Sequence, residues 1–311
     1  MTMISSILET LRVIVLSVYY YFEAFIMKFC SAPKNVAGEI VLITGSANGI
    51  GKQIALNFAS LGAILVLWDI DEEGNRETAE LAKRNGALAV YTYKCDCSKR
   101  EEVYAVAEQV KKEVGDVNIL INNAGIVTGK NFLDIPDCKM DETLDVNFKA
   151  HFWTCKAFLP AMIACNRGHL VSTASVAGMI GSNQLSDYCA SKAAVIGFWE
   201  TVAFELQAAG KKGIKTTIVC PYYVHTNLFT GVKTTRPCLL PILDVEYVGK
   251  TIVDGIRKDK FYVFPLPFTK LAALKVFLPR KALFLFAQYF GLYENMADYK
   301  GRSTEEQKKK V

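Results

Sequence analysis

The chain has 311 residues, 51% hydrophobic and 22% charged, a composition that suits a globular protein with a sizeable core. Its 36 basic and 31 acidic residues leave a net charge of +5, too small to indicate nucleic acid as a partner, and no stripe of basic and aromatic residues is present. The nine cysteines are scattered without a CxxC pair, which is typical of free thiols in a reducing compartment.

Residues 1–35 are predicted to form a hydrophobic membrane anchor. Apolar side chains recur four and three residues apart over residues 4–29, which places them along one side of a helix. The longest uncharged run, residues 13–22, has ten residues, fewer than the roughly 18 of a clean transmembrane span. We therefore expect the helix to lie in the membrane interface or to dip into it, with a soluble docking helix as the alternative. Lys28 and Lys34 follow it and predict that the rest of the chain faces the cytosol.

Residues 36–263 alternate between predicted strands and helices and are expected to form one domain. Short apolar runs predict strands over residues 40–44, 63–69, 88–96, 117–125, 168–175 and 215–221. Helices are predicted over residues 50–61, 72–85, 101–114, 141–165 and 188–209. Continuous apolar strands separated by helices predict an α/β fold, a doubly wound parallel sheet with helices on both faces. Ligands of such a fold bind at the carboxyl ends of the strands.

A glycine-rich turn, TGSANGIG at residues 44–51, lies between the first predicted strand and its helix. Gly45 permits a tight turn, Gly49 lets the backbone approach a pyrophosphate, and Gly51 lets helix and sheet pack closely. The amino-terminus of the helix offers N–H groups and a partial positive charge to phosphate. The turn therefore predicts a dinucleotide site, with contacts from Gly45, Ser46, Asn48, Gly49, Ile50 and Gly51.

Asp69 ends the second predicted strand, eighteen residues after Gly51. A carboxylate at this place accepts hydrogen bonds from the ribose diol of NAD and repels the 2′-phosphate of NADP. The neighbours Trp68, Ile70 and Asp71 supply no basic side chain for such a phosphate. The sequence therefore favours NAD, and a solvent-exposed aspartate at a strand end is the alternative.

Tyr188 and Lys192, in the sequence DYCASK, stand four residues apart on a predicted helix, so their side chains lie close together. A phenol has a pKa near 10, and a nearby ammonium together with a positively charged nicotinamide favours the phenolate. Tyr188 is then expected to take a proton from an alcohol while the carbon gives hydride to the cofactor. Ser175 is expected to hold the substrate oxygen, and Asn147 to order a water that relays protons from Lys192. An ordinary pair on a helix surface is the alternative.

These motifs, with NNAG at residues 122–125, together resemble the short-chain dehydrogenase/reductase family over roughly residues 36–262. The resemblance implies a single-domain Rossmann-like fold in which Asn147, Ser175, Tyr188 and Lys192 form a catalytic tetrad. It also implies a dimer or a tetramer, with a homodimer favoured, in which the helix bearing Tyr188 packs against its twin. Further cofactor contacts are implied at Asp96, Asn123, Ala124, Gly125, Tyr188, Lys192, Pro221 and Thr226.

The sequence PYYVHT, residues 221–226, departs from the family, because Tyr222 replaces a glycine expected beside the nicotinamide. Residues 222–245 are the predicted substrate loop and carry many apolar side chains and few charges. An apolar channel favours a lipophilic alcohol, although core packing explains part of this composition. The predicted substrate contacts are Ser175, Met179, Leu185, Tyr222 and His225. The three histidines show no zinc-like spacing, so no metal is expected.

Residues 264–311 form the last predicted segment. The apolar and aromatic stretch 264–293 carries interspersed basic residues and predicts a pair of membrane-surface helices, with a hydrophobic cap over the core as the alternative. The final KKKV is similar to a dilysine retrieval signal for the endoplasmic reticulum.

The hydrophobic amino-terminus, LVLWDI at residues 65–70 and the sequence that begins PYYVHTNLF resemble the membrane-bound retinol dehydrogenase branch of the family. This resemblance implies oxidation of all-trans-retinol to the aldehyde with NAD, at the endoplasmic reticulum membrane or on lipid droplets. Dehydrogenation of steroids or long-chain fatty alcohols remains open. A non-catalytic lipid-droplet scaffold that retains the dinucleotide fold is the alternative from another functional class.

Overall fold

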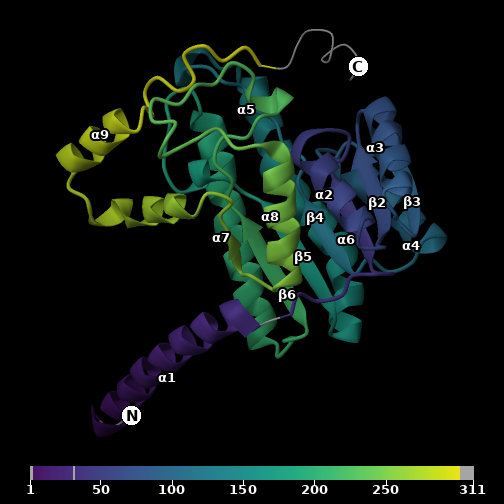
Figure 1. Cartoon of the computed structure of the whole chain (residues 1–311), viewed down its shortest axis with the longest axis horizontal. Helices are drawn as coiled ribbons and strands as arrows, with labels where there is room; N and C mark the ends of the chain where they lie inside the picture. Colours follow the sequence, from purple (N-terminus) through teal and green to yellow (C-terminus); the bar gives the residue numbers. More distant parts are fainter. Residues whose placement is uncertain (1–2, 31, 302–311) are drawn as a thin grey trace. The chain divides into compact units, whose positions relative to one another are not determined.

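The computed structural model describes residues 3–30 and 32–301, and the chain divides into two compact units after Lys34. The first unit contains one helix, α1 (Met3–Cys30), close to the predicted bounds (Figure 1). Its apolar side chains, among them Leu8 and Val15, are exposed. The part Met3–Glu23 is long and apolar enough to cross a membrane, with a mean hydropathy of 1.4. A signal sequence near an amino-terminus has the same properties.

The second unit is built on a parallel sheet with the strand order β3-β2-β1-β4-β5-β6-β7 (Figure 1). The order reverses direction between β1 and β4, and ligands of open α/β sheets bind at such a switch point. Six of these strands were predicted, and the short β7 was not. The bounds are β1 Ile40–Thr44, β2 Ile64–Asp69, β3 Ala89–Lys94, β4 Ile119–Asn122, β5 Gly168–Thr173, β6 Ile214–Val219 and β7 Tyr262–Val263.

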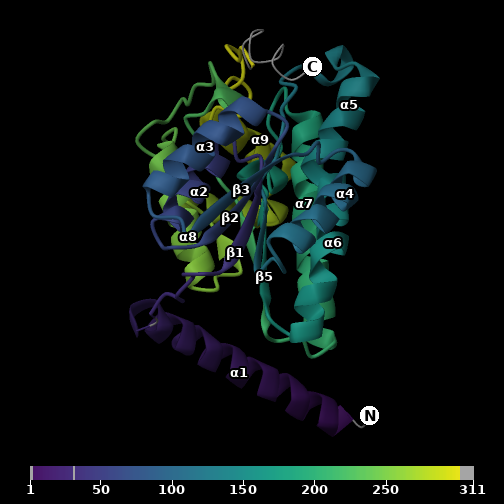
Figure 2. The ribbon, with the colours of Figure 1, turned by 90° about the vertical axis from the view of Figure 1, so that its right-hand side faces the viewer.

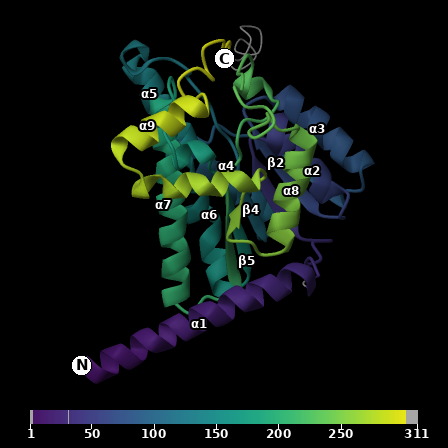
Figure 3. The ribbon, with the colours of Figure 1, turned by 60° about the vertical axis from the view of Figure 1, so that its left-hand side comes forward.

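Helices cover both faces of the sheet, as predicted (Figures 2 and 3). Successive side chains of a strand point to opposite faces. Leu42 of β1 therefore joins a buried cluster with α4, α6 and α7, whereas Val41 and Ile43 join a second cluster with α2, α3 and α8. The bounds are α2 Gly49–Ala59, α3 Glu72–Arg84, α4 Arg100–Glu113, α5 Asp137–Leu144, α6 Ala150–Cys165, α7 Ser186–Ala208 and α8 Val245–Arg257. The predicted Rossmann-like, doubly wound fold is confirmed.

Two helical regions differ from the prediction. The expected helix over residues 141–165 is divided by a wider π-helical turn, Asp145–Lys149, which carries Asn147. Turns of this kind are frequent at functional sites. Helix α8 was not predicted, although Asp244 caps it by accepting hydrogen bonds from the backbone N–H groups of Glu246 and Tyr247.

The carboxyl-terminal part belongs to the same compact unit as the sheet. The predicted helix pair is present as a 3₁₀ helix, η5 (Pro267–Phe277), followed by α9 (Arg280–Tyr289). Large apolar side chains on both are exposed, including Phe277 and Leu285. After α9 the chain continues to Gly301 through a series of turns.

Candidate active site

The glycine-rich turn between β1 and α2 has little room for side chains. Gly45 has a φ of +69°, a left-handed conformation that favours glycine. A Cβ added at Gly51 would overlap the carbonyl oxygen of Gly45. The helix therefore lies closer to the turn than a residue with a side chain at position 51 would allow. The Asn123 side chain donates hydrogen bonds to the carbonyl oxygens of Thr44 and Gly45, each at 3.1 Å. The turn is therefore fixed by close backbone packing.

A cavity of about 900 Å³ extends from this turn along the carboxyl ends of the strands to Tyr188. Its size suits a dinucleotide together with a small molecule. Most of the predicted site residues line it. They are Gly45, Asn48, Gly49, Ile50, Asp69, Asp96, Asn123, Ala124, Gly125, Ser175, Leu185, Tyr188, Lys192, Pro221, Tyr222 and Thr226.

Five predicted site residues lie behind the cavity wall or away from it: Ser46, Gly51, Asn147, Met179 and His225. Ser46 is fully buried and lies 2.8 Å from the Asn75 side chain, so it supports the turn from below. Met179 packs against the hydrophobic core, and His225 is exposed. Neither Met179 nor His225 lines this cavity, and their role as substrate contacts stays a prediction. Neighbouring residues of an extended segment point in opposite directions, so the burial of Val224 turns His225 outward.

Asp69 is held at the cavity edge by the backbone. One carboxylate oxygen accepts a hydrogen bond from the Ala47 N–H at 2.9 Å, and the other from the Asp71 N–H at 3.0 Å. A carboxylate oxygen accepts more than one hydrogen bond, so both keep capacity for a ligand diol. Asp96 is similarly anchored, by the Ser98 N–H and hydroxyl.

Tyr188 and Lys192 are both buried in the inner part of the cavity. The Lys192 Nζ donates a hydrogen bond to the Thr173 carbonyl oxygen at 2.7 Å and lies 5.6 Å from the centroid of the Tyr188 ring. Burial lowers the pKa of Lys192 to about 8. Burial also raises the pKa of Tyr188, and a hydrogen bond with the Ser175 side chain opposes this rise. Removal from water thus opposes the phenolate, so the expected shift toward phenolate needs positive charge beside the ring that is strong enough to overcome burial.

Asn147 lies beside these two residues and holds the loop that follows β4. Its Nδ2 donates to the Ile126 carbonyl oxygen and to the Ser191 hydroxyl, and its Oδ1 accepts from the Ile126 N–H at 2.8 Å. A Cβ added at Gly125 would lie 3.4 Å from the Asn147 Oδ1 and 3.7 Å from the Lys192 Nζ. Both N–H groups of the Asn147 amide are thus occupied by hydrogen bonds within the protein. Its Oδ1 can accept one further hydrogen bond, and a relay water would bind there.

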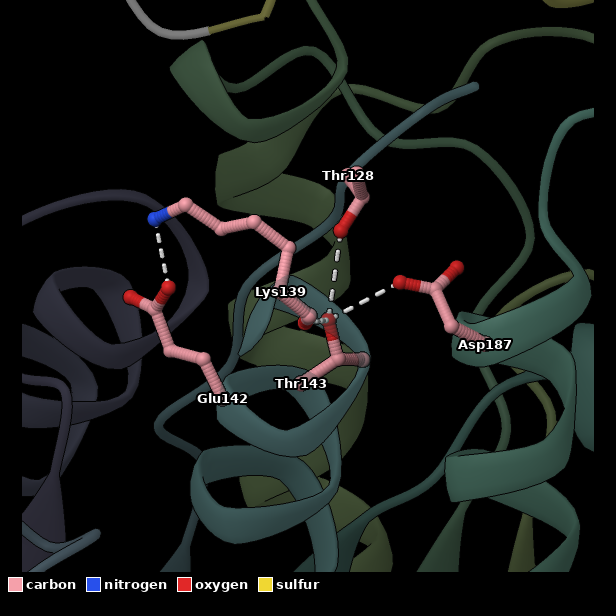
Figure 4. Close-up of polar contacts among 5 residues, drawn as sticks. All are labelled: Thr128, Lys139, Glu142, Thr143 and Asp187. Atoms are coloured by element: carbon pink, nitrogen blue, oxygen red, sulfur yellow. Dashed lines mark hydrogen bonds and ion pairs between the residues drawn. The ribbon is translucent and has the colours of Figure 1, made fainter. Parts of the chain in front are cut away.

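Asp187 in the first turn of α7 and Thr143 of α5 are buried and belong to one network of polar contacts (Figure 4). Asp187 accepts a hydrogen bond from the Tyr188 N–H at 2.8 Å and another from the Thr143 hydroxyl at 2.9 Å. The Thr143 hydroxyl lies 3.3 Å from that of Thr128, whose loop lines the cavity. Sequence reasoning did not identify this network. The sequence feature that could have indicated it is Asp187, because an aspartate in the first turn of a helix is favourably placed to accept hydrogen bonds there.

The end of the cavity beyond Tyr188 is apolar and aromatic. The Tyr188 ring makes an edge-to-face contact with Phe229, at 5.8 Å between centroids. Sequence reasoning also missed wall residues that the tertiary fold alone brings to the site. They are Leu292, Tyr299, Lys300 and Gly301, near the end of the described chain.

Comparison with known proteins places this site in a family. Residues 39–237 match the family model described as short chain dehydrogenase. The chain is 56% identical over 282 residues to epidermal retinol dehydrogenase 2 of Mus musculus, covering 90% of this chain and 91% of that protein. It is 45% identical over 278 residues to 17-beta-hydroxysteroid dehydrogenase 13 of Homo sapiens, covering 89% and 91%.

Solved structures show the same architecture. A short-chain dehydrogenase/reductase from Burkholderia phymatum in complex with NAD matches with a TM-score of 0.70 and 28% identity, covering 81% of this chain and 96% of that one. A metagenomic short-chain oxidoreductase in complex with NADP matches with a TM-score of 0.62 and 27% identity, covering 74% and 98%. With its glycine-rich turn and its buried Tyr188–Lys192 pair, the chain belongs to the short-chain dehydrogenase family.

Proposed function

We propose that this protein oxidises a lipophilic alcohol, all-trans-retinol in particular, to the aldehyde with NAD as the hydride acceptor. The observation that carries the proposal is the meeting of Ser175, Tyr188 and Lys192 in one cavity, between the glycine-rich turn and an apolar end. The 56% identity to epidermal retinol dehydrogenase 2 supports the choice of retinol.

The residues of the turn fit a nicotinamide dinucleotide. Gly45 and Gly49 have positive φ angles and leave the backbone bare, and the amino-terminus of α2 lies at the cavity. Free N–H groups of a helix amino-terminus bind phosphate, so this end would hold the pyrophosphate. Asp69 would accept from the adenosine ribose diol, which supports NAD over NADP. When bound, the cofactor supplies the carbon that accepts hydride.

Tyr188 is the proposed proton acceptor. Its buried phenol requires a cation to reach the phenolate state, and the Lys192 ammonium is the nearby side chain that supplies one. The Ser175 hydroxyl, which hydrogen bonds with Tyr188, would hold the oxygen of the alcohol. Asn147 would bind the water through which the proton passes from Tyr188 and Lys192 to solvent.

Steroid alcohols are the second candidate substrates. The 45% identity to 17-beta-hydroxysteroid dehydrogenase 13 favours them, and the aromatic walls suit a fused-ring alcohol as well as a polyene. A non-catalytic scaffold is less well supported, because a scaffold has no need of all four tetrad residues.

We infer that the protein is attached to the endoplasmic reticulum membrane or to lipid droplets, with the catalytic unit in the cytosol. The exposed apolar side chains of α1 support an anchor over residues 1–35, and those of η5 and α9 support membrane contact by residues 264–301. The KKKV sequence lies outside the described residues. Small residues on α7, such as Ala193 and Gly197, support a homodimer through this helix.

The test is an assay of alkali-washed membranes from cells that express the protein. The membranes receive NAD with all-trans-retinol, a steroid alcohol or a long-chain fatty alcohol, and NADH and aldehyde are measured. Wild-type protein should oxidise retinol fastest, and Tyr188→Phe should lose at least about a hundredfold in rate while it still binds NADH.

Equal turnover by Tyr188→Phe would refute the assigned proton acceptor. A faster rate with the steroid or the fatty alcohol would move the substrate assignment to that class. Activity released into the alkaline wash would contradict the membrane anchor.

A further inference from the structure

The last described residues, 292–301, form a segment that we name the carboxyl-terminal strap. It follows α9 as part of the yellow end of the ribbon (Figure 1). Its backbone is hydrogen bonded to two segments that line the cavity or lie beside it. The Leu292 carbonyl oxygen accepts from the Asn183 N–H at 2.9 Å, close to Leu185 and the start of α7. At the other end, the Lys300 N–H donates to the Thr230 carbonyl oxygen at 3.0 Å in the substrate loop. The strap therefore bridges the segments on both sides of Tyr188.

The strap also shares an apolar cluster with the proposed proton acceptor. Met296 is 2% exposed and packs in one cluster with Leu185, Tyr188, Tyr223 and Val232. An ion pair between Lys233 and Asp298, at 2.5 Å, lies at the exposed side of this cluster. Burial of Met296 is the part that holds the strap, since an exposed ion pair adds little stability.

Tyr299 is the strap residue whose aromatic ring lines the cavity. Its hydroxyl donates a hydrogen bond to the Val127 carbonyl oxygen at 3.3 Å. Its ring lies directly on Gly129, where an added Cβ would overlap the ring and where φ is +69°. Val127, Gly129, Tyr188 and Tyr299 all line the same cavity. The ring thus joins the strap to the loop that Asn147 holds.

We propose that Tyr299 determines substrate specificity: its ring forms the outer wall of the alcohol pocket and limits the width of the molecule that reaches Tyr188. This proposal rests on the proposed function only in taking an alcohol as the substrate. A pocket discriminates between substrates through the space it leaves, and removal of an aromatic ring opens space beside the reacting group. An alcohol with a wide fused-ring skeleton should therefore be oxidised more efficiently by the enlarged pocket. A slender polyene should be oxidised less efficiently, because it loses contacts with the wall.

The test compares Tyr299→Ala with a matched control, Tyr293→Ala. Tyr293 belongs to the same strap, but it is 46% exposed and its hydroxyl bonds to the Phe284 carbonyl oxygen, away from the cavity. In Tyr299→Ala the ratio of kcat/KM for a steroid alcohol to that for retinol should rise about tenfold. Tyr293→Ala should keep the wild-type ratio, and Tyr299→Phe should stay near it because the ring remains.

A second measurement follows the contact itself. Amide hydrogen exchange of residues 126–130 should become faster in Tyr299→Ala and remain unchanged in Tyr293→Ala. An unchanged substrate ratio, or unchanged exchange, in a folded Tyr299→Ala would overturn the proposal, as would an equal shift in the control. A wild-type protein that oxidises neither alcohol would refute the proposed function instead, and the exchange measurement would then decide whether Tyr299 forms the wall.

Discussion

The two halves of the cavity are built in different ways. The half that is proposed to bind the cofactor, here named the cofactor half, consists of backbone and small side chains from residues 44–51 and 122–125, with Asp69 at its edge. The substrate half consists of large side chains, such as Tyr222, Phe229 and Tyr299, from segments far apart in the chain.

This difference has a physical origin. A site made of backbone needs residues that leave the backbone bare, so it requires glycine at fixed spacing. A site made of apolar side chains needs only the right volume, which many residues supply from many places. The first kind is therefore encoded in a short motif, whereas the second depends on the whole fold.

The largest effect is expected from Gly51→Ala, which damages the cofactor half alone. The added methyl group overlaps the Gly45 carbonyl oxygen, so the turn and the start of α2 must move apart. A misplacement of about 1 Å costs on the order of a hundredfold in catalytic rate. We expect kcat/KM for the cofactor to fall by about that factor, and NADH binding, measured by fluorescence enhancement, to weaken as well.

The control for this variant lies in the substrate half. A Cβ added at Gly181 would meet nothing within 4 Å, so Gly181→Ala should bind NADH as the wild type does. Wild-type affinity in Gly51→Ala would show that the turn adapts without loss, and that backbone packing does not define this half.

A smaller effect concerns Lys192, which stands where the two halves meet. Its pKa is about 8 in the folded protein, against 10.5 in the unfolded chain. Between these values the unfolded chain binds more protons, so the free energy of unfolding rises with pH. Below pH 8 the burial of the charged lysine costs about 3 kcal/mol, a cost that decreases as the pH rises. The opposing slope from Tyr188, whose pKa is raised, begins only above about pH 10.

Urea denaturation of wild type and Lys192→Met between pH 7 and pH 10 measures this slope. The stability of the wild type relative to the variant should increase by about 2 kcal/mol over the range. Groups common to both proteins cancel in the difference. Parallel pH curves would mean that Lys192 is not buried as a titrating group at the junction.

The smallest expected effect is on cofactor choice. Asp69→Ala removes the charge that repels a 2′-phosphate, so the preference for NAD over NADP in kcat/KM should fall by about tenfold. The ratio of kcat/KM for a steroid alcohol to kcat/KM for retinol should stay constant, because Asp69 lies in the cofactor half. Asp116→Ala, at an exposed aspartate, serves as the control. An unchanged preference in Asp69→Ala would contradict the role given to this carboxylate.

The sequence was sufficient to predict six strands of the sheet, most of the helices on its two faces and the glycine-rich turn, because periodic apolar runs and glycine spacing act locally. Met179 and His225 do not line the cavity, since proximity in sequence to Ser175 or Tyr222 does not fix the direction of a side chain. Sequence reasoning also missed the contribution of Tyr299, which no local pattern connects to Tyr188. The pKa of Tyr188 depends on burial, and burial is a property of the folded state.

The position of the strap separates the proposed choice of alcohol from the proposed chemistry. If Tyr299 sets the width of the alcohol pocket, substitutions within residues 292–301 would change which alcohol enters, whereas the glycine-rich turn and the Tyr188–Lys192 pair belong to earlier segments of the chain. A new substrate preference could therefore be engineered in this segment with the residues proposed for hydride and proton transfer left unaltered.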